Sequence, residues 1–441
     1  MRNLPPVRVI LIAFTLAVWV GVGALMLPMA RRADGGANFM ESFFTATSAI
    51  CVTGLVTVDT ISYWTPFGQA VILALIQIGG LGVMSLATLI GLSVLGKISL
   101  STRITAASEA KAEGLDDVSG VMGSIVRIAF TIEGVVAAVL ALRFRFGYAM
   151  SWPDALWHGL FHAVSSFNNA GFALYSDNLM GFVGDPWVCL PIAASIILGG
   201  MGFPVLAQLR RHLGNPLRWS MNTRIVLAIT PVLLIAGSIY ITAIEWANPA
   251  TLGGLSWSDR LLAGFFQSVQ TRTAGFNSID IGAMHQASWL GMDVLMFIGG
   301  GPAGTAGGIK VTTFAVLFFI IATEVQGDTS VNVFGKRLPR AVHRQALTVA
   351  LLSVALVVTS TVLLMLVTPY SLDQVLFETA SAFGTVGLST GITPHLNYPA
   401  QLLLCFLMYV GRLGPITVAS ALALRTRKRL YELPQERPII G

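Results

Sequence analysis

Long apolar stretches divide the chain into segments that could cross a bilayer. A helix needs about 20 mostly apolar residues to span a hydrocarbon core of ~30 Å. Such runs predict eight spanning helices, the sixth of them interrupted: 7–30, 68–95, 121–142, 186–207, 224–245, 289–323, 342–367 and 400–424. The first is too long for a signal-peptide core and has no convincing small-residue cleavage site, so we expect it to be retained.

Four further apolar runs are too short to cross and too apolar for water. They fall within 40–60, 155–175, 260–280 and 374–390, and each breaks at glycine, threonine or asparagine after ten to fourteen residues. This length is typical of re-entrant segments. Non-helical backbone at membrane depth is tolerated only inside protein or beside a water-filled cavity. The runs therefore predict four short helices, entering from outside, whose loops line a pore.

The glycines at these breaks mark a fourfold internal repeat. Gly54, Gly171, Gly275 and Gly387 lie 117, 104 and 112 residues apart in a chain of 441, and ten residues before each stands a phenylalanine (Phe44, Phe161, Phe265 and Phe377). Close packing of glycine-rich helices would explain the glycines downstream, but not this shared spacing. We predict repeats at 1–100, 101–215, 216–330 and 331–425, and a tail at 426–441.

The predicted fold class is an all-α integral membrane protein. Each repeat would consist of a spanning helix, a re-entrant pore helix with its loop, and a second spanning helix, arranged around a pseudo-fourfold pore. Composition agrees, since 54% of residues are hydrophobic and 11% are charged, against ~25% charged residues in soluble proteins. This excludes a soluble enzyme, a disordered chain and a nucleic-acid binder. Three distant cysteines indicate no disulfide framework.

The distribution of basic residues predicts the orientation. If both ends lie inside, eighteen lysines and arginines fall on the inner side and five on the outer side, and four lie within membrane segments. An excess of Lys and Arg marks cytoplasmic loops. We therefore expect a multi-pass membrane protein with both termini in the cytoplasm.

The four loops carry the residue types of an ion-selectivity filter. Potassium channels replace the ion's hydration shell with backbone carbonyls from four TVGYG loops. Glycine permits the backbone angles that turn successive carbonyls toward one axis, and the negative end of each short helix favours a cation. The predicted potassium-binding tripeptides are Val52-Thr53-Gly54, Asn169-Ala170-Gly171, Thr273-Ala274-Gly275 and Thr385-Val386-Gly387. Three of them depart from TVG, which predicts a filter that selects among ions less strictly than that of a true tetrameric channel.

Two features beneath the filter indicate a gate. Arg412 stands where the other repeats have Gly80, Gly200 and Gly300, and an intramembrane arginine is by default a functional hypothesis, here an electrostatic barrier or latch. The alternative is an arginine that braces loop carbonyls. The sixth span is broken by glycines and a proline, which helices do not tolerate. The predicted gating residues there are Gly299, Gly300, Gly301, Pro302, Gly304, Thr305, Gly307, Gly308 and Lys310.

Other polar residues in the apolar segments are expected to have structural roles. We expect Arg272 to brace the third loop, and Glu133 with Arg127 to form a helix contact or interface anchor. His158 and His162 lack the HExxH pattern of a zinc site, because Gly159 replaces the glutamate, and are expected to pack. No catalytic constellation stands out, so the chain is not expected to be an enzyme.

These motifs together resemble the Trk/Ktr/HKT superfamily of potassium transporters, and within it the KtrB-type membrane subunits. The matching stretches are VTGLV at 52–56, NNAGF at 168–172, TRTAGF at 271–276, TVGLST at 385–390, GGGPAGTAGGIK at 299–310 and GRLGP at 411–415. The resemblance implies potassium uptake assisted by sodium, with no organic cofactor in this chain. It also implies a homodimer on a cytoplasmic ring of KtrA-type RCK nucleotide-binding subunits, and an intramembrane gating loop at 299–310.

Two other functions stay open at this stage. One is a sodium-permeable or nonselective cation channel of the same fold. The other is a secondary carrier with inverted repeats, although all four predicted repeats enter the membrane from the same side. An intramembrane enzyme would need a polar catalytic set, which the sequence does not show.

Overall fold

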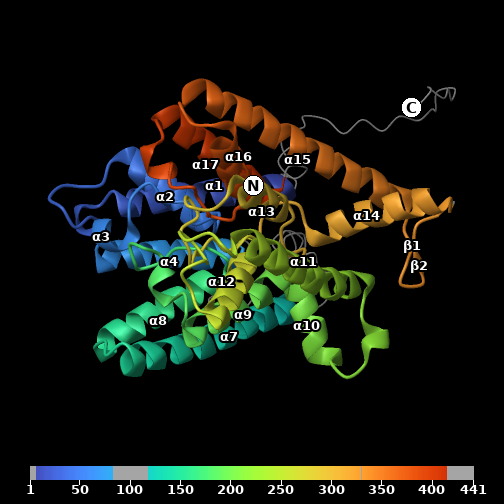
Figure 1. The fold of residues 1–441 in the computed structure, drawn as a ribbon, viewed down its shortest axis with the longest axis horizontal. Helices are drawn as coiled ribbons and strands as arrows, with labels where there is room; N and C mark the ends of the chain where they lie inside the picture. Colours follow the sequence, from blue (N-terminus) through green and yellow to red (C-terminus); the bar gives the residue numbers. More distant parts are fainter. Residues whose placement is uncertain (1–5, 83–117, 329, 415–441) are drawn as a thin grey trace.

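The computed structural model describes residues 6–82, 118–328 and 330–414. Their helices form four successive units of similar composition, coloured in chain order in Figure 1. The first unit contains α1 Pro6–Leu25, α2 Phe39–Ile50, α3 Thr60–Tyr63 and α4 Pro66–Leu81. The second contains α7 Val118–Gly147, α8 Trp152–Phe167, α9 Pro186–Met201 and α10 Phe203–His212. The third contains α11 Met221–Glu245, α12 Trp257–Gln270, α13 Gln286–Phe297 and α14 Val311–Gln326, and the fourth contains α15 Arg340–Val367, α16 Leu372–Gly384 and α17 Tyr398–Leu413. Between α14 and α15, β1 Asn332–Val333 and β2 Lys336–Arg337 form a two-residue antiparallel ladder, a small exception to the all-α prediction.

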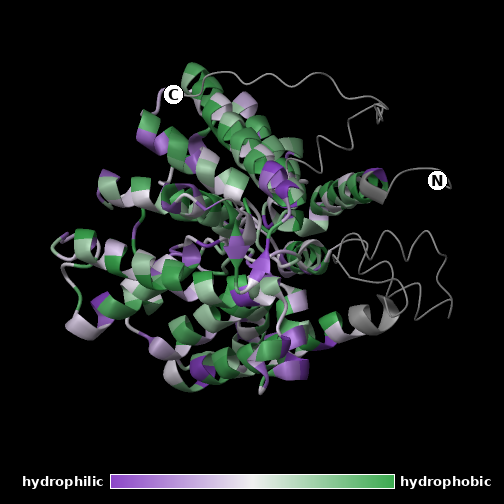
Figure 2. Cartoon of the chain, turned by 90° about the vertical axis from the view of Figure 1, so that its right-hand side faces the viewer, coloured by the Kyte–Doolittle hydropathy of each residue, from purple (hydrophilic) through white to green (hydrophobic). Residues whose placement is uncertain are grey.

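The first helix of each unit is long and apolar enough to cross a membrane. These segments are Arg8–Leu25, Gly123–Gly147, Met221–Glu245 and Arg340–Val367, and a fifth crossing results if the bent pair α9 and α10 counts as one. Large apolar side chains on them face outward, such as Leu16 (63% exposed), Ile239 (65%) and Leu351 (69%). Helices that are hydrophobic over most of their length dominate Figure 2. An apolar exterior of this extent marks a surface that water does not cover.

Local sequence fixes where the shorter helices begin. Thr65, Ser151, Asp185 and Asn397 each accept a backbone hydrogen bond as N-cap, and a proline stands in the first turn that follows. A polar cap satisfies a free N–H group of the first turn, and proline fits there because its missing N–H would have no helical partner.

The second helices differ from the prediction of spans that are continuous except in the third repeat. A bend of 97° separates α9 from α10 inside the predicted span 186–207. It lies at Gly202, with φ 95° and ψ 140°, and α4 and α17 end at Gly82 and Gly414 with nearly the same angles. Only glycine adopts this conformation readily. The predictions for 83–95, 415–424 and the tail 426–441 lie outside the described residues.

The four units close on themselves, so that the last lies beside the first. The Tyr409 hydroxyl of α17 lies 2.6 Å from the Thr15 hydroxyl and donates to the Leu11 carbonyl of α1 at 3.0 Å. The short helices α2, α8, α12 and α16 coincide with the four short apolar runs, and Phe44, Phe161 and Phe377 on them are fully buried. In the third unit the corresponding Phe265 is only half-buried, and its neighbour Phe266 is fully buried.

Candidate functional site

The loops after the four short helices share one backbone conformation. We call residues 51–55, 168–172, 271–276 and 385–388 the glycine loops. The glycine of each has positive φ, and so does the residue two places earlier: Val52 (50°), Asn169 (58°), Thr273 (88°) and Thr385 (49°). Residues other than glycine rarely adopt a backbone conformation with positive φ. Its recurrence at one position of all four loops identifies them as four copies of one structure.

The four glycine loops meet in a closed ring. A Cβ atom added to Gly54 would lie 2.4 Å from the Ala170 carbonyl oxygen, and one added to Gly171 would lie 2.4 Å from the Ala274 oxygen. The series continues from Gly275 to the Val386 oxygen (2.1 Å) and returns from Gly387 to the Thr53 oxygen (2.1 Å). Each loop therefore touches the next in chain order, and the fourth touches the first. Four equivalent carbonyl oxygens, each just before a glycine, belong to this ring.

In each unit, a side chain of the short helix forms a hydrogen bond with the backbone of the glycine loop, either at the glycine or at the residue after it. Gly54 N donates to Ser48 Oγ at 3.0 Å, and Gly387 N donates to Ser381 Oγ at 3.1 Å. In the second unit, Ser165 Oγ donates to the Phe172 carbonyl at 2.8 Å. The third unit departs from this pattern: Phe276 N donates to Gln270 Oε1 at 3.1 Å. The sequence analysis missed these anchors, although a serine six residues before the glycine in three repeats could have revealed them.

Glycines of the second helices let those helices contact the ends of the short helices. A Cβ on Gly79, Gly199 or Gly411 would lie 1.9 to 2.0 Å from a carbonyl oxygen in the last turn of α2, α8 or α16. Any other residue would push the two helices apart. In the third unit Gly299 instead lies against the Gly307 oxygen, within the interrupted segment.

Buried polar side chains brace the second and third loops. Arg272 donates to the Thr230 carbonyl of α11 at 3.3 Å and to the Gly299 carbonyl at 3.0 Å, which is the bracing geometry expected for it. Asn168, the equivalent residue of the second loop, donates to Glu133 at 3.1 Å and to Gln77 at 3.0 Å. Glu133 therefore forms a helix-to-helix contact, with Gln77 and Asn168 as its described partners.

The glycine-rich segment, residues 299–310, crosses between units beside the ring. Gly301 N and Thr305 N donate to the carbonyls of Gly200 (2.7 Å) and Gly199 (3.3 Å), and Thr305 Oγ1 donates to the Phe167 carbonyl at 3.3 Å. A Cβ on Gly307 would lie 2.1 Å from Thr385 Oγ1 of the fourth loop. Belonging to the third unit, the segment thus contacts both the second and the fourth.

Arg412 joins this segment to two other units. Its guanidinium group donates to the Thr305 carbonyl and, through its second terminal nitrogen, to the Gly79 carbonyl of α4. These contacts fit the bracing alternative and a latch equally, because both place the arginine on the segment. Lys310 lies at the far end of the segment, where Nζ donates to the Ala306 carbonyl at 2.5 Å.

Comparison with known proteins places the chain among transporters. The model of the TrkH family, described as cation transport protein, matches residues 9–429. The chain is 38% identical over 435 residues to Ktr system potassium uptake protein B of Vibrio alginolyticus, covering 98% of this chain and 94% of that protein. It is 35% identical over 448 residues to the potassium/sodium uptake protein NtpJ of Enterococcus hirae, covering 100% and 98%.

A solved structure has the same fold. The potassium transporter TrkH from Vibrio parahaemolyticus superposes with a TM-score of 0.74 at 18% identity, covering 94% of this chain and 84% of that one. The resemblance found in the sequence motifs is therefore confirmed. This chain belongs to the TrkH family of cation transport proteins.

Proposed function

We propose that this chain is the pore-forming membrane subunit of a Ktr-type potassium uptake system. The closed ring of glycine loops is the observation that carries the proposal, because it brings four equivalent carbonyls together about one axis. Such a ring can replace the water around a monovalent cation. The relatives named for potassium uptake, which match nearly the whole chain, support potassium as the transported ion. The filter would consist of residues 52–54, 169–171, 273–275 and 385–387.

The proposed topology has eight spans, four re-entrant loops and both termini in the cytoplasm of a bacterium. Its support is the recurrence in each unit of one long apolar helix, one short buried helix and a second, shorter helix after the glycine loop. The proposal includes repeat boundaries near 100, 215 and 330, of which the first lies outside the described residues. Single cysteines at the exposed positions Asp34 and Lys336 test it, since the three native cysteines are buried. An impermeant thiol reagent added outside should label the first and not the second, and the reverse result would overturn the orientation.

The glycine-rich segment and Arg412 form the proposed gate. Hydrogen bonds to the Gly199, Gly200 and Thr305 carbonyls hold the segment between units. Because glycine gives the segment many accessible backbone conformations, it could move aside once these bonds break. Arg412 would hold it closed, and its charge would repel a cation beneath the filter.

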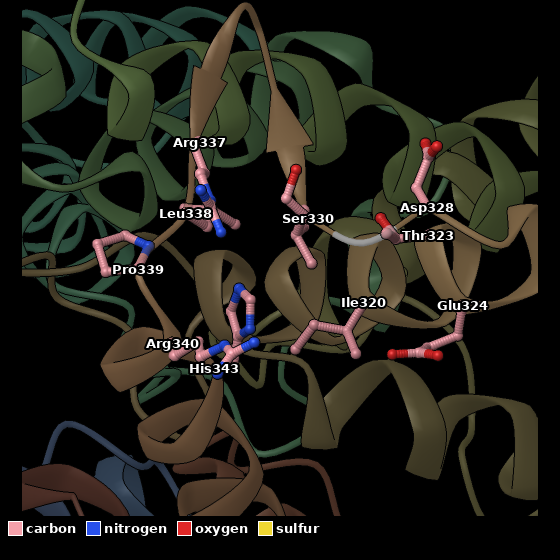
Figure 3. A pocket seen from close by; sticks show the side chains of 11 residues that line it. Ile320, Thr323, Glu324, Asp328, Ser330, Arg337, Leu338, Pro339, Arg340 and His343 are labelled. Atoms are coloured by element: carbon pink, nitrogen blue, oxygen red, sulfur yellow. The ribbon is translucent and has the colours of Figure 1, made fainter.

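A cavity at one end of the molecule is the proposed contact with a cytoplasmic nucleotide-binding ring. It measures about 400 Å³ and lies among the end of α14, the hairpin and the start of α15. Figure 3 shows Arg337 of the hairpin and His343 of α15 toward one side of it, across from Thr323 of α14 and Asp328. Arg337 and Arg340 line it together with Glu324 and Asp328, so it offers both charges to a protein partner. The homodimer implied by the family resemblance also belongs to this proposal.

Rubidium uptake tests the proposed function. A bacterium that lacks its own potassium transport should accumulate rubidium when it produces this chain with its cytoplasmic partner, and added potassium should compete better than sodium. Equal competition by sodium would favour the nonselective alternative, which the potassium/sodium name of NtpJ keeps open. Absence of uptake, with the protein present in the membrane, would overturn the proposal.

A further inference from the structure

The short helices α8 and α16 carry a polar side chain at an equivalent buried position. His162 and Glu378 both stand nine residues before their loop glycine, and both are 0% exposed. The backbone N–H of Leu174 donates to His162 Nε2 at 3.3 Å, and that of Thr390 donates to Glu378 Oε1 at 3.1 Å. Leu174 and Thr390 each follow the glycine by three residues. In units 2 and 4, one side chain therefore fixes the chain where it leaves the glycine loop.

Glu378 makes the larger set of contacts. Ser389 Oγ donates to Oε1 at 2.5 Å, and Thr393 Oγ1 donates to Oε2 at 2.7 Å. Together with the Thr390 N–H group, these donors come from the whole segment that follows the fourth loop, residues 389–393. Hydrogen bonds to a carboxylate are about twice as strong as those between neutral groups. Glu378 thus ties this segment firmly back to its own short helix.

His162 is held in the orientation that its contact requires. Nδ1 lies 2.7 Å from the His158 carbonyl oxygen, which can only accept, so Nδ1 carries the proton. Nε2 is then free to accept from Leu174. The Tyr175 ring stacks beside the imidazole with centroids 5.2 Å apart and limits its rotation. The histidine therefore packs, as expected from its sequence, and it also anchors a loop.

Units 1 and 3 lack this anchor. The equivalent residues are Thr45, whose hydroxyl has no hydrogen-bond partner in the described part of the chain, and Phe266, which cannot accept from an N–H group in this way. The ring runs in chain order, so unit 2 lies opposite unit 4 and unit 1 opposite unit 3. Anchored loops therefore face each other across one diagonal, and loops without this anchor face each other across the other.

We propose that His162 and Glu378 are positioning residues that set discrimination between potassium and sodium. The inference rests on the proposed potassium pathway. Selection of the larger ion by cavity size requires carbonyls that do not close in around the smaller one. When two opposite loops are hydrogen-bonded to their own short helices, the distance between their carbonyl oxygens across the ring stays fixed along that diagonal. Release of either loop should therefore weaken selectivity more than transport itself.

The chain supplies its own test variants, because units 1 and 3 show which residues the position accepts. The variants are E378T and H162F, which copy Thr45 and Phe266, with E378Q as the conservative change and T45V as the matched control. The measurement is the ratio of the sodium and potassium concentrations that halve rubidium uptake. We expect this ratio to fall about tenfold in E378T and about threefold in H162F, since a neutral hydrogen bond contributes less than a charged one. E378Q retains an acceptor oxygen, so its concentration ratio should stay close to that of the wild-type chain. The ratio of T45V should be unchanged.

An unchanged ratio in E378T and H162F, with only a slower rate, would overturn the proposal and leave both residues a structural role. An equal fall in T45V would also overturn it, because that position lacks the anchor. If E378T does not reach the membrane, H162F decides alone by the same criterion. Rubidium uptake by the wild-type chain separates the two levels: without it the proposed function fails, whereas uptake with an unchanged ratio in the variants refutes this inference only.

Discussion

Replacement of Gly387 by alanine tests the closed ring directly. The added Cβ would lie 2.1 Å from the Thr53 carbonyl oxygen and 3.0 Å from the Gly54 Cα of the first loop. Carbon and oxygen atoms that are not bonded need more than 3 Å, so the first loop must move by roughly 1 Å or the fourth must retreat. Either movement shifts a carbonyl that the proposed filter uses.

The size of the effect follows from two separate terms. Alanine at the φ of 92° found at Gly387 costs roughly 1–2 kcal/mol in backbone strain. Overpacking of a filled site costs about 1–3 kcal/mol more. If the second term appears as lost ion binding, the potassium concentration for half-maximal uptake should rise about 5- to 150-fold.

Gly391 provides the matched control for strain. It has a φ of 94° in the same unit, but a Cβ there meets no atom within 4 Å. Rubidium uptake in a cell deficient in potassium transport, measured against potassium concentration, should therefore be nearly normal in Gly391→Ala and strongly impaired in Gly387→Ala. Equal behaviour of the two variants would refute the ring, because strain alone would then explain the result.

Three further predictions concern the gate and the packing beneath it. Arg412→Gln should raise rubidium flux severalfold by removing a charged contact to the glycine-rich segment, and unchanged or reduced flux would contradict a latch. Deletion of residues 302–305 should likewise raise flux, whereas a folded but inactive protein would count against a mobile gate. Gly199→Ala should lower the melting temperature by several degrees, since its Cβ would lie 1.9 Å from the Phe167 oxygen, while Gly134→Ala, with open space around it, should not. Similar melting temperatures for these two glycine variants would contradict the close helix contact.

Much of the candidate site could be predicted from the sequence, because the patterns that mark it lie within short stretches of the chain. The four loop glycines repeat at nearly equal spacing, and the break at residues 299–310 follows from composition alone. Both depend on what glycine and proline permit, which is a property of a short stretch of chain.

The remaining features depend on contacts between distant parts of the chain. The bend at Gly202 could not be predicted from the sequence. In an apolar helix a glycine can mark either a bend or a place where another helix packs closely. Glu378 and His162 share no residue type, so only their common partner position, three residues past the glycine, reveals that they correspond. The partners of Arg412 lie 107 and 333 residues away in sequence. A repeating pattern of residue types along the sequence does not show which distant residues form such contacts.

The lone arginine shows what four linked copies in one polypeptide make possible. Four identical subunits would place an arginine in every quadrant, and that much positive charge would bar any cation from the axis. Here the other three quadrants keep glycine at Gly80, Gly200 and Gly300. In the proposed gate, joining the four copies in one polypeptide therefore allows a single arginine to act, so that one substitution changes the charge there by one unit.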